Sequence, residues 1–282
     1  MSIARLMQQA AAGVPTGGGD VWTDPDLANA SYDSVSFSVA GQETTPTEIV
    51  FSTDGSKFYI IGNVTDSIYQ YSLSTPFDLS TASYDSISFS VGSQMGNPYG
   101  IFFSPDGTKM FALDISTDAV YQYSLSTGFD LSTASYDSVS FSAAGQDTNT
   151  IGLSFNPEGT KMFVLGITND AVYQYSLSTG FDLSTASYDS VSFSVASQDT
   201  VPSSTRFNPD GTKLFVLGVV TDAVYQYSLS TGFDLSTASY DSVSFSVASQ
   251  EATPYGFDFS SDGSKMYVVG SVNDTIYQYS TA

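Results

Sequence analysis

The segment Tyr136-Asp137-Ser138-Val139-Ser140-Phe141-Ser142 decides the fold, because the chain contains it five times. The copies, one of them with Ile in place of Val, begin at Tyr32, Tyr84, Tyr136, Tyr188 and Tyr240. Each copy begins 52 residues after the one before it, as Tyr84 follows Tyr32. A constant period of about this size is the signature of a repeat architecture, such as a solenoid, a propeller or an array.

Two further segments keep the same period and divide each repeat. (Asp/Glu)-Gly-(Ser/Thr)-Lys begins at Asp54, Asp106, Glu158, Asp210 and Asp262, and Tyr-Gln-Tyr-Ser begins at Tyr69, Tyr121, Tyr173, Tyr225 and Tyr277. No insertion or deletion separates the copies. Within a repeat, period-two alternation interrupted by turn residues predicts four strands, which in the second copy cover residues 100–104, 109–113, 119–125 and 136–143.

Four antiparallel strands repeated radially form the blades of a β-propeller. The chain enters at a fourth strand, residues 32–39, and stops just after a third strand, residues 275–280. Pairing these two strands completes the last blade and removes both exposed edges. The sequence therefore predicts an all-β, five-bladed β-propeller over residues 25–282, closed by its N-terminal strand. A stacked solenoid is the less favoured alternative, because its terminal repeats would diverge into polar caps.

Residues 1–24, which precede the ring, are expected to form an arm. Residues 2–12 fit a short helix with Ile3, Leu6 and Met7 on one face, and the glycines at 13 and 17–19 make a flexible connector. A helix this short is marginal in water on its own. We expect Ile3, Leu6 and Met7 to anchor the chain on a partner, with a disordered tail as the alternative.

The composition excludes several classes of partner and of chemistry. Seven Lys and Arg residues stand against 29 Asp and Glu, a net charge of −22, so we expect no nucleic-acid binding. No stretch approaches the roughly 20 apolar residues of a membrane span, and the first residues make a poor secretory signal. Because the chain has no Cys and no His, it has no thiol nucleophile, disulfide, imidazole base or His- or Cys-ligated metal site.

Differences among the five copies locate a candidate binding face. The connections from strand one to two and from strand three to four hardly change, whereas those from strand four to the next strand one, and from strand two to three, vary. The two variable sets fall on the same face of a propeller, which we call the variable-loop face. Binding residues are often carried on loops by a rigid scaffold.

Three kinds of side chain on this face are candidate ligand contacts. An amide opens every four-to-one loop, either to satisfy loop backbone groups or to form a polar ring for a ligand: Gln42, Gln94, Gln146, Gln198 and Gln250. A carboxylate follows in four copies, either as solvated loop charge or as a weak candidate for Ca²⁺: Glu43, Asp147, Asp199 and Glu251. Tyr99 and Tyr255 share one loop position, as anchors for a sugar or protein or as packing over the channel mouth.

We expect the lysines of the repeats and Arg206 to form ion pairs with acidic residues nearby. One Lys starts the second strand of every repeat, at 57, 109, 161, 213 and 265, and is expected to pair locally. Arg206 is the one cation at its inner-strand position, where the other four copies have Val, Phe, Ser and Asp. We expect it to pair with the Asp of this series, Asp258, in the neighbouring blade. Apart from the weak Ca²⁺ possibility, we expect no cofactor and no metal.

The unit Phe-(Ser/Asn)-Pro-Asp-Gly-Thr-Lys-(Met/Leu)-Phe-Val-Leu-Gly, followed by Asp-Ala-Val-Tyr-Gln-Tyr-Ser-Leu-Ser-Thr, resembles the bacterial and phage propeller repeats of the Tyr-Val-Thr-Asn (YVTN) and lactonase-like families. The resemblance covers residues 25–282 and implies the fold. Lactonase-like enzymes bring catalytic His or metal ligands that this chain lacks, so no activity carries over. The start Met-Ser-Ile-Ala-Arg-Leu-Met-Gln-Gln-Ala-Ala-Ala-Gly resembles the short anchors of marine phage virion proteins.

These observations lead to three functional hypotheses. The first is a non-enzymatic phage virion protein, either a capsid decoration, a fibre head or a tail-associated component. Residues 1–20 would bind other virion proteins, and the propeller would face a host-surface glycan or protein. The second is a bacterial surface or secreted propeller that binds a glycan or protein. The third, a carboxylate-based glycoside hydrolase, is disfavoured because no blade carries an insertion around a site. We expect a virion or extracellular location and no enzymatic activity.

Overall fold

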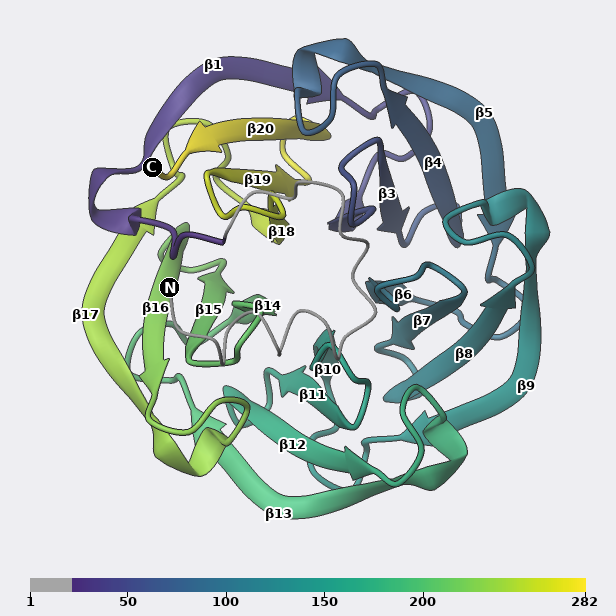
Figure 1. Cartoon of the computed structure of the whole chain (residues 1–282), viewed down its shortest axis with the longest axis vertical. Helices are drawn as coiled ribbons and strands as arrows, with labels where there is room; N and C mark the ends of the chain where they lie inside the picture. Colours follow the sequence, from purple (N-terminus) through teal and green to yellow (C-terminus); the bar gives the residue numbers. More distant parts are fainter. Residues whose placement is uncertain (1–21) are drawn as a thin grey trace, which may run out of the picture.

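The computed structural model describes residues 22–282, in which five antiparallel sheets of four strands each stand around a central axis (Figure 1). The predicted all-β, five-bladed propeller is confirmed. Helical structure in the described part consists of five three-residue 3₁₀ turns. None of the described residues belongs to a helix long and apolar enough to cross a membrane.

Each blade has an inner, a second, a third and an outer strand. In order from blade one to blade five, the inner strands are β2 (Pro46–Phe51), β6 (Pro98–Phe103), β10 (Thr150–Phe155), β14 (Pro202–Phe207) and β18 (Pro254–Phe259). The second strands are β3 (Lys57–Gly62), β7 (Lys109–Asp114), β11 (Lys161–Gly166), β15 (Lys213–Gly218) and β19 (Lys265–Gly270).

The third strands are β4 (Ser67–Leu73), β8 (Ala119–Leu125), β12 (Ala171–Leu177), β16 (Ala223–Leu229) and β20 (Thr275–Ser280). The outer strands are β5 (Ala82–Ser90), β9 (Ala134–Ser142), β13 (Ala186–Ser194), β17 (Ala238–Ser246) and, for blade five, β1 (Ser31–Ser38). A 3₁₀ turn precedes each outer strand: η2 (Leu79–Thr81), η3 (Leu131–Thr133), η4 (Leu183–Thr185), η5 (Leu235–Thr237) and η1 (Leu27–Asn29).

Ring closure is made by the N-terminal strand, as predicted. The last sheet has the order β1-β20-β19-β18, with β1 antiparallel to β20. Tyr32 lies opposite Tyr279, and Phe37 lies opposite Ile276. The two ends of the described chain therefore share one blade (Figure 1), and neither terminal strand is left with two free edges.

The same aromatic pair recurs at every interface between neighbouring blades. The Phe that ends each inner strand packs against an aromatic ring in the second strand of the preceding blade. The centroid distances are 4.3 Å for Phe51 and Tyr267, 4.5 Å for Phe103 and Tyr59, 4.7 Å for Phe155 and Phe111, 4.4 Å for Phe207 and Phe163, and 4.9 Å for Phe259 and Phe215. Such pairs contribute roughly 0.5–1.5 kcal/mol beyond their buried area.

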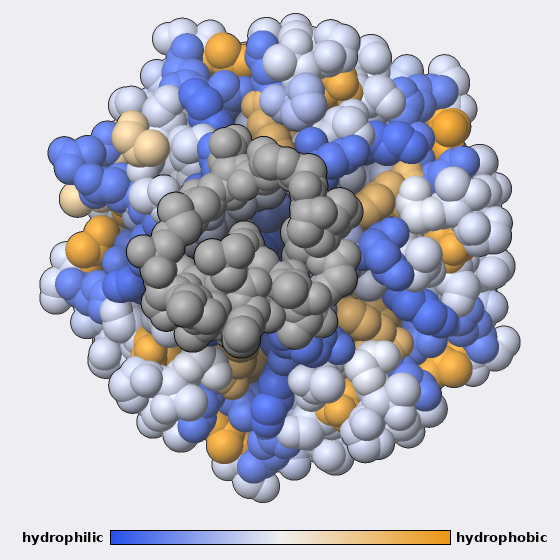
Figure 2. Space-filling view, viewed as in Figure 1, coloured by the Kyte–Doolittle hydropathy of each residue, from blue (hydrophilic) through white to orange (hydrophobic). Residues whose placement is uncertain are grey.

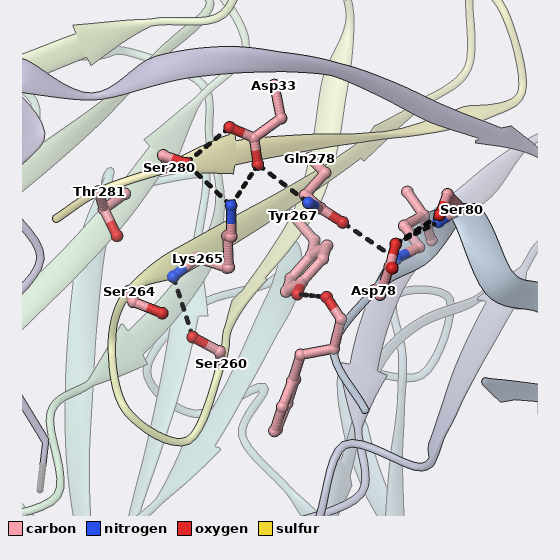
Figure 3. A network of polar contacts seen from close by, with 12 residues as sticks. Asp33, Asp78, Ser80, Ser260, Ser264, Lys265, Tyr267, Gln278, Ser280 and Thr281 are labelled. Atoms are coloured by element: carbon pink, nitrogen blue, oxygen red, sulfur yellow. Dashed lines mark hydrogen bonds and ion pairs between the residues drawn. The ribbon is translucent and has the colours of Figure 1, made fainter. Parts of the chain in front are cut away.

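The Tyr-Gln-Tyr-Ser motif adds a polar link between blades. Gln122 donates its side-chain amide to Asp137 in its own blade at 2.8 Å, and its amide oxygen accepts the backbone N–H of Leu183 in the next blade at 2.9 Å. Lys109 also contacts Asp137, at 2.8 Å. Local lysine pairing is thus confirmed in blades two to five, and Figure 3 shows it at Lys265 and Asp33. Lys57 instead donates to the Phe129 carbonyl at 2.9 Å.

The surface of the ring is predominantly polar. On the face drawn in Figure 2, outside the area that grey atoms cover, apolar residues stand singly among polar ones. Among the described residues, the large apolar side chains that are exposed are Val64, Val220 and Val272, at 57–61 %. All three lie in loops between a second and a third strand, on the variable-loop face of blades one, four and five.

Candidate functional site

The variable-loop face is built from two sets of loops that contact each other. Loops from an outer strand to the next inner strand lie beside loops from a second to a third strand, because both leave their sheets at the same end. In blade three the two are tied by Asp147 of the first loop, whose carboxylate accepts the backbone N–H groups of Thr168 and Asn169 in the second at 3.2 and 3.0 Å. The scaffold beneath this face is therefore rigid.

The carboxylates that follow the loop glutamines are buried rather than solvated. Glu43, Asp147, Asp199 and Glu251 are between 0 and 3 % exposed. Each accepts hydrogen bonds from backbone N–H groups, as Asp199 does from Val201 at 2.7 Å and Thr221 at 2.9 Å. The interpretation of these groups as solvated loop charge is wrong. Their role is to join the two loops of a blade.

Blade two supplies the same carboxylate from a different strand. Met95 stands where the other blades have Glu or Asp, and Asp114 stands where they have Gly. Asp114 accepts from the backbone N–H groups of Asn97 at 2.8 Å and Thr117 at 3.1 Å. In blade one, a Cβ on Gly62 would collide with the Glu43 side chain. Only one of the two positions can therefore carry the carboxylate, and the other must leave room for it.

This geometry bears on the Ca²⁺ possibility. The oxygens of Glu43, Asp147 and Asp199 accept from backbone N–H and hydroxyl donors, which a cation would have to displace. Among the described residues, Glu251 has one oxygen that is buried without a partner. Among residues 22–282 there is no group of three or more Asp, Glu, His or Cys side chains arranged to hold a metal ion.

The loop glutamines contact tyrosines of the third strand. The side-chain oxygens of Gln42, Gln146, Gln198 and Gln250 accept the hydroxyl groups of Tyr71, Tyr175, Tyr227 and Tyr279 at 3.0–3.5 Å. In blade two the corresponding Tyr123 hydroxyl is buried without a partner among the described residues, although Gln94 occupies the same position. All five glutamines are partly exposed, so their amide NH₂ groups remain near the surface.

Tyr99 and Tyr255 meet, although they come from blades that are not neighbours. Their ring centroids are 5.8 Å apart and nearly perpendicular, at 87°. Blades two and five lie on either side of blade one, so the contact crosses the centre of the ring. Both rings are half-buried. Burial is the largest effect on Tyr99 and raises its pKa, and the adjoining Tyr255 raises it further, so the Tyr99 phenol stays neutral at ordinary pH.

A buried charge cluster joins three blades below this pair. Arg206 contacts Asp258 at 3.1 Å, which confirms the predicted pair. It also reaches across to Glu48 in blade one, at 3.2 Å, which the sequence did not predict. Ser204 donates to the second oxygen of Glu48 at 2.7 Å, and Arg206 donates to the Ile49 carbonyl at 2.9 Å. The cluster holds blades four, five and one together.

One cation is shared by two buried carboxylates in this cluster. Burial is the largest effect on Glu48 and raises its pKa to about 7 against the opposing charge of Arg206. Burial raises the pKa of Asp258 as well. Since one guanidinium cannot fully compensate two carboxylates in a low-dielectric site, a proton is retained more strongly here than in water.

Glu48 was the residue that sequence reasoning missed, and the repeats contained a signal for it. The equivalent positions are Gly100, Gly152, Ser204 and Gly256, all small. Glu48 is the one acidic residue at its repeat position, and Arg206 is the one basic residue at its own. This combination is compatible with an ion pair between the two across the ring. A Cβ on Gly256 would collide with the backbone and carboxylate of Glu48, so the small residue gives the larger one its space.

The predicted anchor residues Ile3, Leu6 and Met7 lie outside the described residues. The proposed helix, the connector, the contact with other virion proteins and the resemblance to phage anchors therefore stay predictions.

Comparisons with known proteins support the fold. No protein-family model and no curated protein matches the chain. A solved protein from Lactobacillus plantarum is similar, with a TM-score of 0.51 and 13 % identity, over 83 % of this chain and 67 % of that one. A functionally unknown protein from Desulfotomaculum acetoxidans has a TM-score of 0.46 and 14 % identity, over 80 % of this chain. This chain spans 62 % of the length of that protein.

The expectation that the chain is not an enzyme has to be corrected. Solved structures similar to it include one from Bacteroides uniformis titled a "putative 6-phosphogluconolactonase", with a TM-score of 0.49 and 13 % identity, over 84 % of this chain and 72 % of that one. At this identity the likeness shows the fold alone and assigns no activity. None of these comparisons supports a role in a phage virion.

Proposed function

We propose that this chain is a glycan-binding propeller whose variable-loop face contacts its ligand at Tyr99 and Tyr255. The observation that carries the proposal is the contact between these two rings across the centre of the ring. Their edge-to-face pair, at 5.8 Å, is half-buried, and Tyr99 also packs against the apolar cluster that contains Ile151. Aromatic rings of this kind pack against the apolar faces of sugar rings, while neighbouring amides and hydroxyls hydrogen-bond to the sugar hydroxyl groups.

The position of the variation supports this assignment. Blades with almost identical scaffolds differ on the variable-loop face, where Tyr99 and Tyr255 replace Thr47, Ile151 and Ser203. Scaffold positions repeat because every blade needs the same aromatic pair and the same polar link. Positions that differ between blades on the variable-loop face do not have to form these contacts, so their side chains are available to bind a ligand.

Charge narrows the ligand class. With a net charge of −22, the ring repels sulfated, sialylated and phosphorylated ligands, and more so at low ionic strength. Neutral or amino sugars are therefore the favoured class. The extracellular or virion setting that we expect for such a protein, and attachment through residues 1–20, are part of the same proposal.

A glycan array with neutral, amino and acidic sugars tests the proposal. We expect binding to neutral or amino glycans, and a loss of about tenfold or more when Tyr99 and Tyr255 are changed to Ile, as expected for central aromatic anchors. Ile is the residue that blade three carries at this position, Ile151, so thermal melting should be retained. Binding restricted to acidic glycans, or unchanged by the double substitution, would show that the face is misassigned.

A further inference from the structure

The turn between the third and the outer strand presents the same backbone acceptor at four blade interfaces. Phe77, Phe129, Phe181 and Phe233 adopt a left-handed conformation there, with φ of 58–59°. Between blades one and two, the Phe129 carbonyl accepts the Tyr59 hydroxyl at 2.5 Å and the Lys57 ammonium at 2.9 Å. Between blades five and one, the Phe77 carbonyl accepts the Tyr267 hydroxyl, and Figure 3 shows this hydroxyl bonded to a backbone carbonyl.

Among the described residues, this acceptor has no partner between blades three and four, nor between blades two and three, where Phe111 lies beside Phe181. Phe163 stands where Tyr59 and Tyr267 stand and has no hydroxyl group; its ring lies 6.3 Å from that of Phe233. Lys161 is turned to Asp189, at 2.6 Å. Within residues 22–282, no donor is hydrogen-bonded to the Phe233 carbonyl.

An open groove with a volume of about 650 Å³ lies at this same interface. That volume lies within the roughly 300–1,000 Å³ of small-molecule sites. Lys161 lines it with a donor, Asp189 and Asp234 with acceptors, and Val191 and Phe233 with apolar surface. The site thus combines hydrogen-bonding groups of both kinds with an apolar wall.

We propose that this groove, which we call the Phe233 groove, binds a neutral pyranose ring. A ring hydroxyl occupies the place that the Tyr59 hydroxyl takes in the neighbouring interface and donates to the Phe233 carbonyl. Another hydroxyl group accepts from Lys161 and a further one donates to Asp234, while an apolar face of the sugar lies against Val191.

A pyranose suits the groove better than other small ligands. The unfilled carbonyl requires a donor, and an anionic ligand would meet the acidic surface of the protein. An apolar ligand would leave the carbonyl and the carboxylates desolvated without partners. A sugar ring meets both requirements, because its hydroxyl groups donate and accept and its C–H faces are apolar.

The Phe233 groove is separate from the variable-loop face. It is formed by the turns from strand one to two and from strand three to four, represented by Asn156, Thr160 and residues 231–236. These turns lie at the opposite end of the blades from Tyr99 and Tyr255, which stand at the beginning of the inner strands β6 and β18. The proposal therefore stands or falls independently of the glycan contact at the tyrosine pair.

An NMR titration of the full chain with a panel of neutral methyl hexopyranosides and methyl pentopyranosides tests it. We expect amide shifts at residues 156–161 and 231–236. Phe163→Tyr introduces the hydroxyl that fills the interfaces between blades five and one and between blades one and two, and it should weaken binding about tenfold, the value of one well-placed hydrogen bond. Phe111→Tyr makes the same change between blades two and three and is the matched control, with affinity unchanged. Lys161→Gln, which replaces the ammonium donor with a shorter, neutral amide, should weaken binding as well.

The NMR titration distinguishes binding in the Phe233 groove from binding elsewhere. Shifts at these residues that disappear in Phe163→Tyr and persist in Phe111→Tyr support the Phe233 groove. An absence of shifts there with every sugar of the panel would overturn it, and so would Phe163→Tyr and Lys161→Gln that bind as the wild type does. Shifts confined to the loops around Tyr99 and Tyr255 would overturn this site while supporting the proposed function.

Discussion

Arg206 shows how a single residue gives a nearly symmetric ring a fixed arrangement. Its partners are Glu48 of blade one, at 3.2 Å, and Asp258 of blade five, at 3.1 Å. Five similar blades have similar interfaces, so packing alone distinguishes their order weakly. A buried charge cluster has one partner arrangement, since any other leaves a charge unpaired.

Glu48→Gln should change the pH dependence of stability. Burial holds the pKa of Glu48 at about 7 in the folded protein, above its ordinary value of 4.5, so the folded state binds this proton more tightly. The stability of the wild type should therefore fall as the pH rises from about 4.5 to about 7. Urea unfolding over this range should show the wild type losing on the order of 2 kcal/mol relative to Glu48→Gln.

The lysine-paired aspartates do not interfere with this measurement. Burial alone would raise the pKa of Asp137, but hydrogen bonds from Lys109, Ser124 and Gln122 and the charge of Lys109 outweigh it and lower the pKa below 3.8. Their contribution is lost only as the pH falls through that lower range. Parallel stability curves for wild type and Glu48→Gln between pH 4.5 and pH 7 would contradict the assigned role.

At the scale of the elements, every blade joins its two variable loops through a buried carboxylate, even where a different position supplies it. Blades one, three, four and five carry the carboxylate on the loop and Gly on the second strand, as Glu43 and Gly62 do. Blade two reverses this with Met95 and Asp114. In both arrangements the carboxylate accepts backbone N–H groups of the same two loops. The constraint acts on the hydrogen bonds, not on the position that supplies them.

Converting blade two to the arrangement of blade three should show strong coupling. Asp114→Gly alone leaves the N–H groups of Asn97 and Thr117 unpaired and should cost about 1–3 kcal/mol. Met95→Asp alone buries a second carboxylate beside Asp114 and should also destabilise the protein. The double variant should return close to wild-type stability in chemical unfolding, with a coupling energy of about 0.5–3 kcal/mol. Additive losses would mean that the two positions do not share one link.

The strands could be read from the sequence because their signals are local. Residues 109–113 and 119–125 were expected to be strands, and β7 and β8 cover 109–114 and 119–125. The Asp-Gly turn and the period-two pattern fix these elements within one repeat. The burial of Asp147 was missed because it depends on Gly166, which lies in another element and leaves the space that the carboxylate fills.

At the scale of the whole molecule, contacts across the ring were beyond the sequence. Tyr99 with Tyr255 and Arg206 with Glu48 join blades that are not adjacent, and their distances depend on the diameter and twist of the ring. The repeat period says which blade follows which, but not which side chains meet at the centre. Asp258 could be assigned to Arg206 because those two blades are neighbours.

The binding role of the variable-loop face is the central claim, and the chain contains its own reference for testing it. Blade three carries Thr168 where blades one, four and five expose Val64, Val220 and Val272, and it carries Ile151 where blades two and five carry Tyr99 and Tyr255. A variant with these five positions changed to Thr and Ile removes the exposed valines and the tyrosine pair and leaves the buried loop links and the Arg206 cluster intact.

Glycan-array binding of this five-fold variant, measured beside its melting temperature, is the most direct test. The account predicts a melting temperature close to that of the wild type, because each new residue already occurs at the same position of another blade, together with loss of glycan binding. A variant that melts like the wild type and binds the same glycans with the same strength would contradict the assignment of binding to this face.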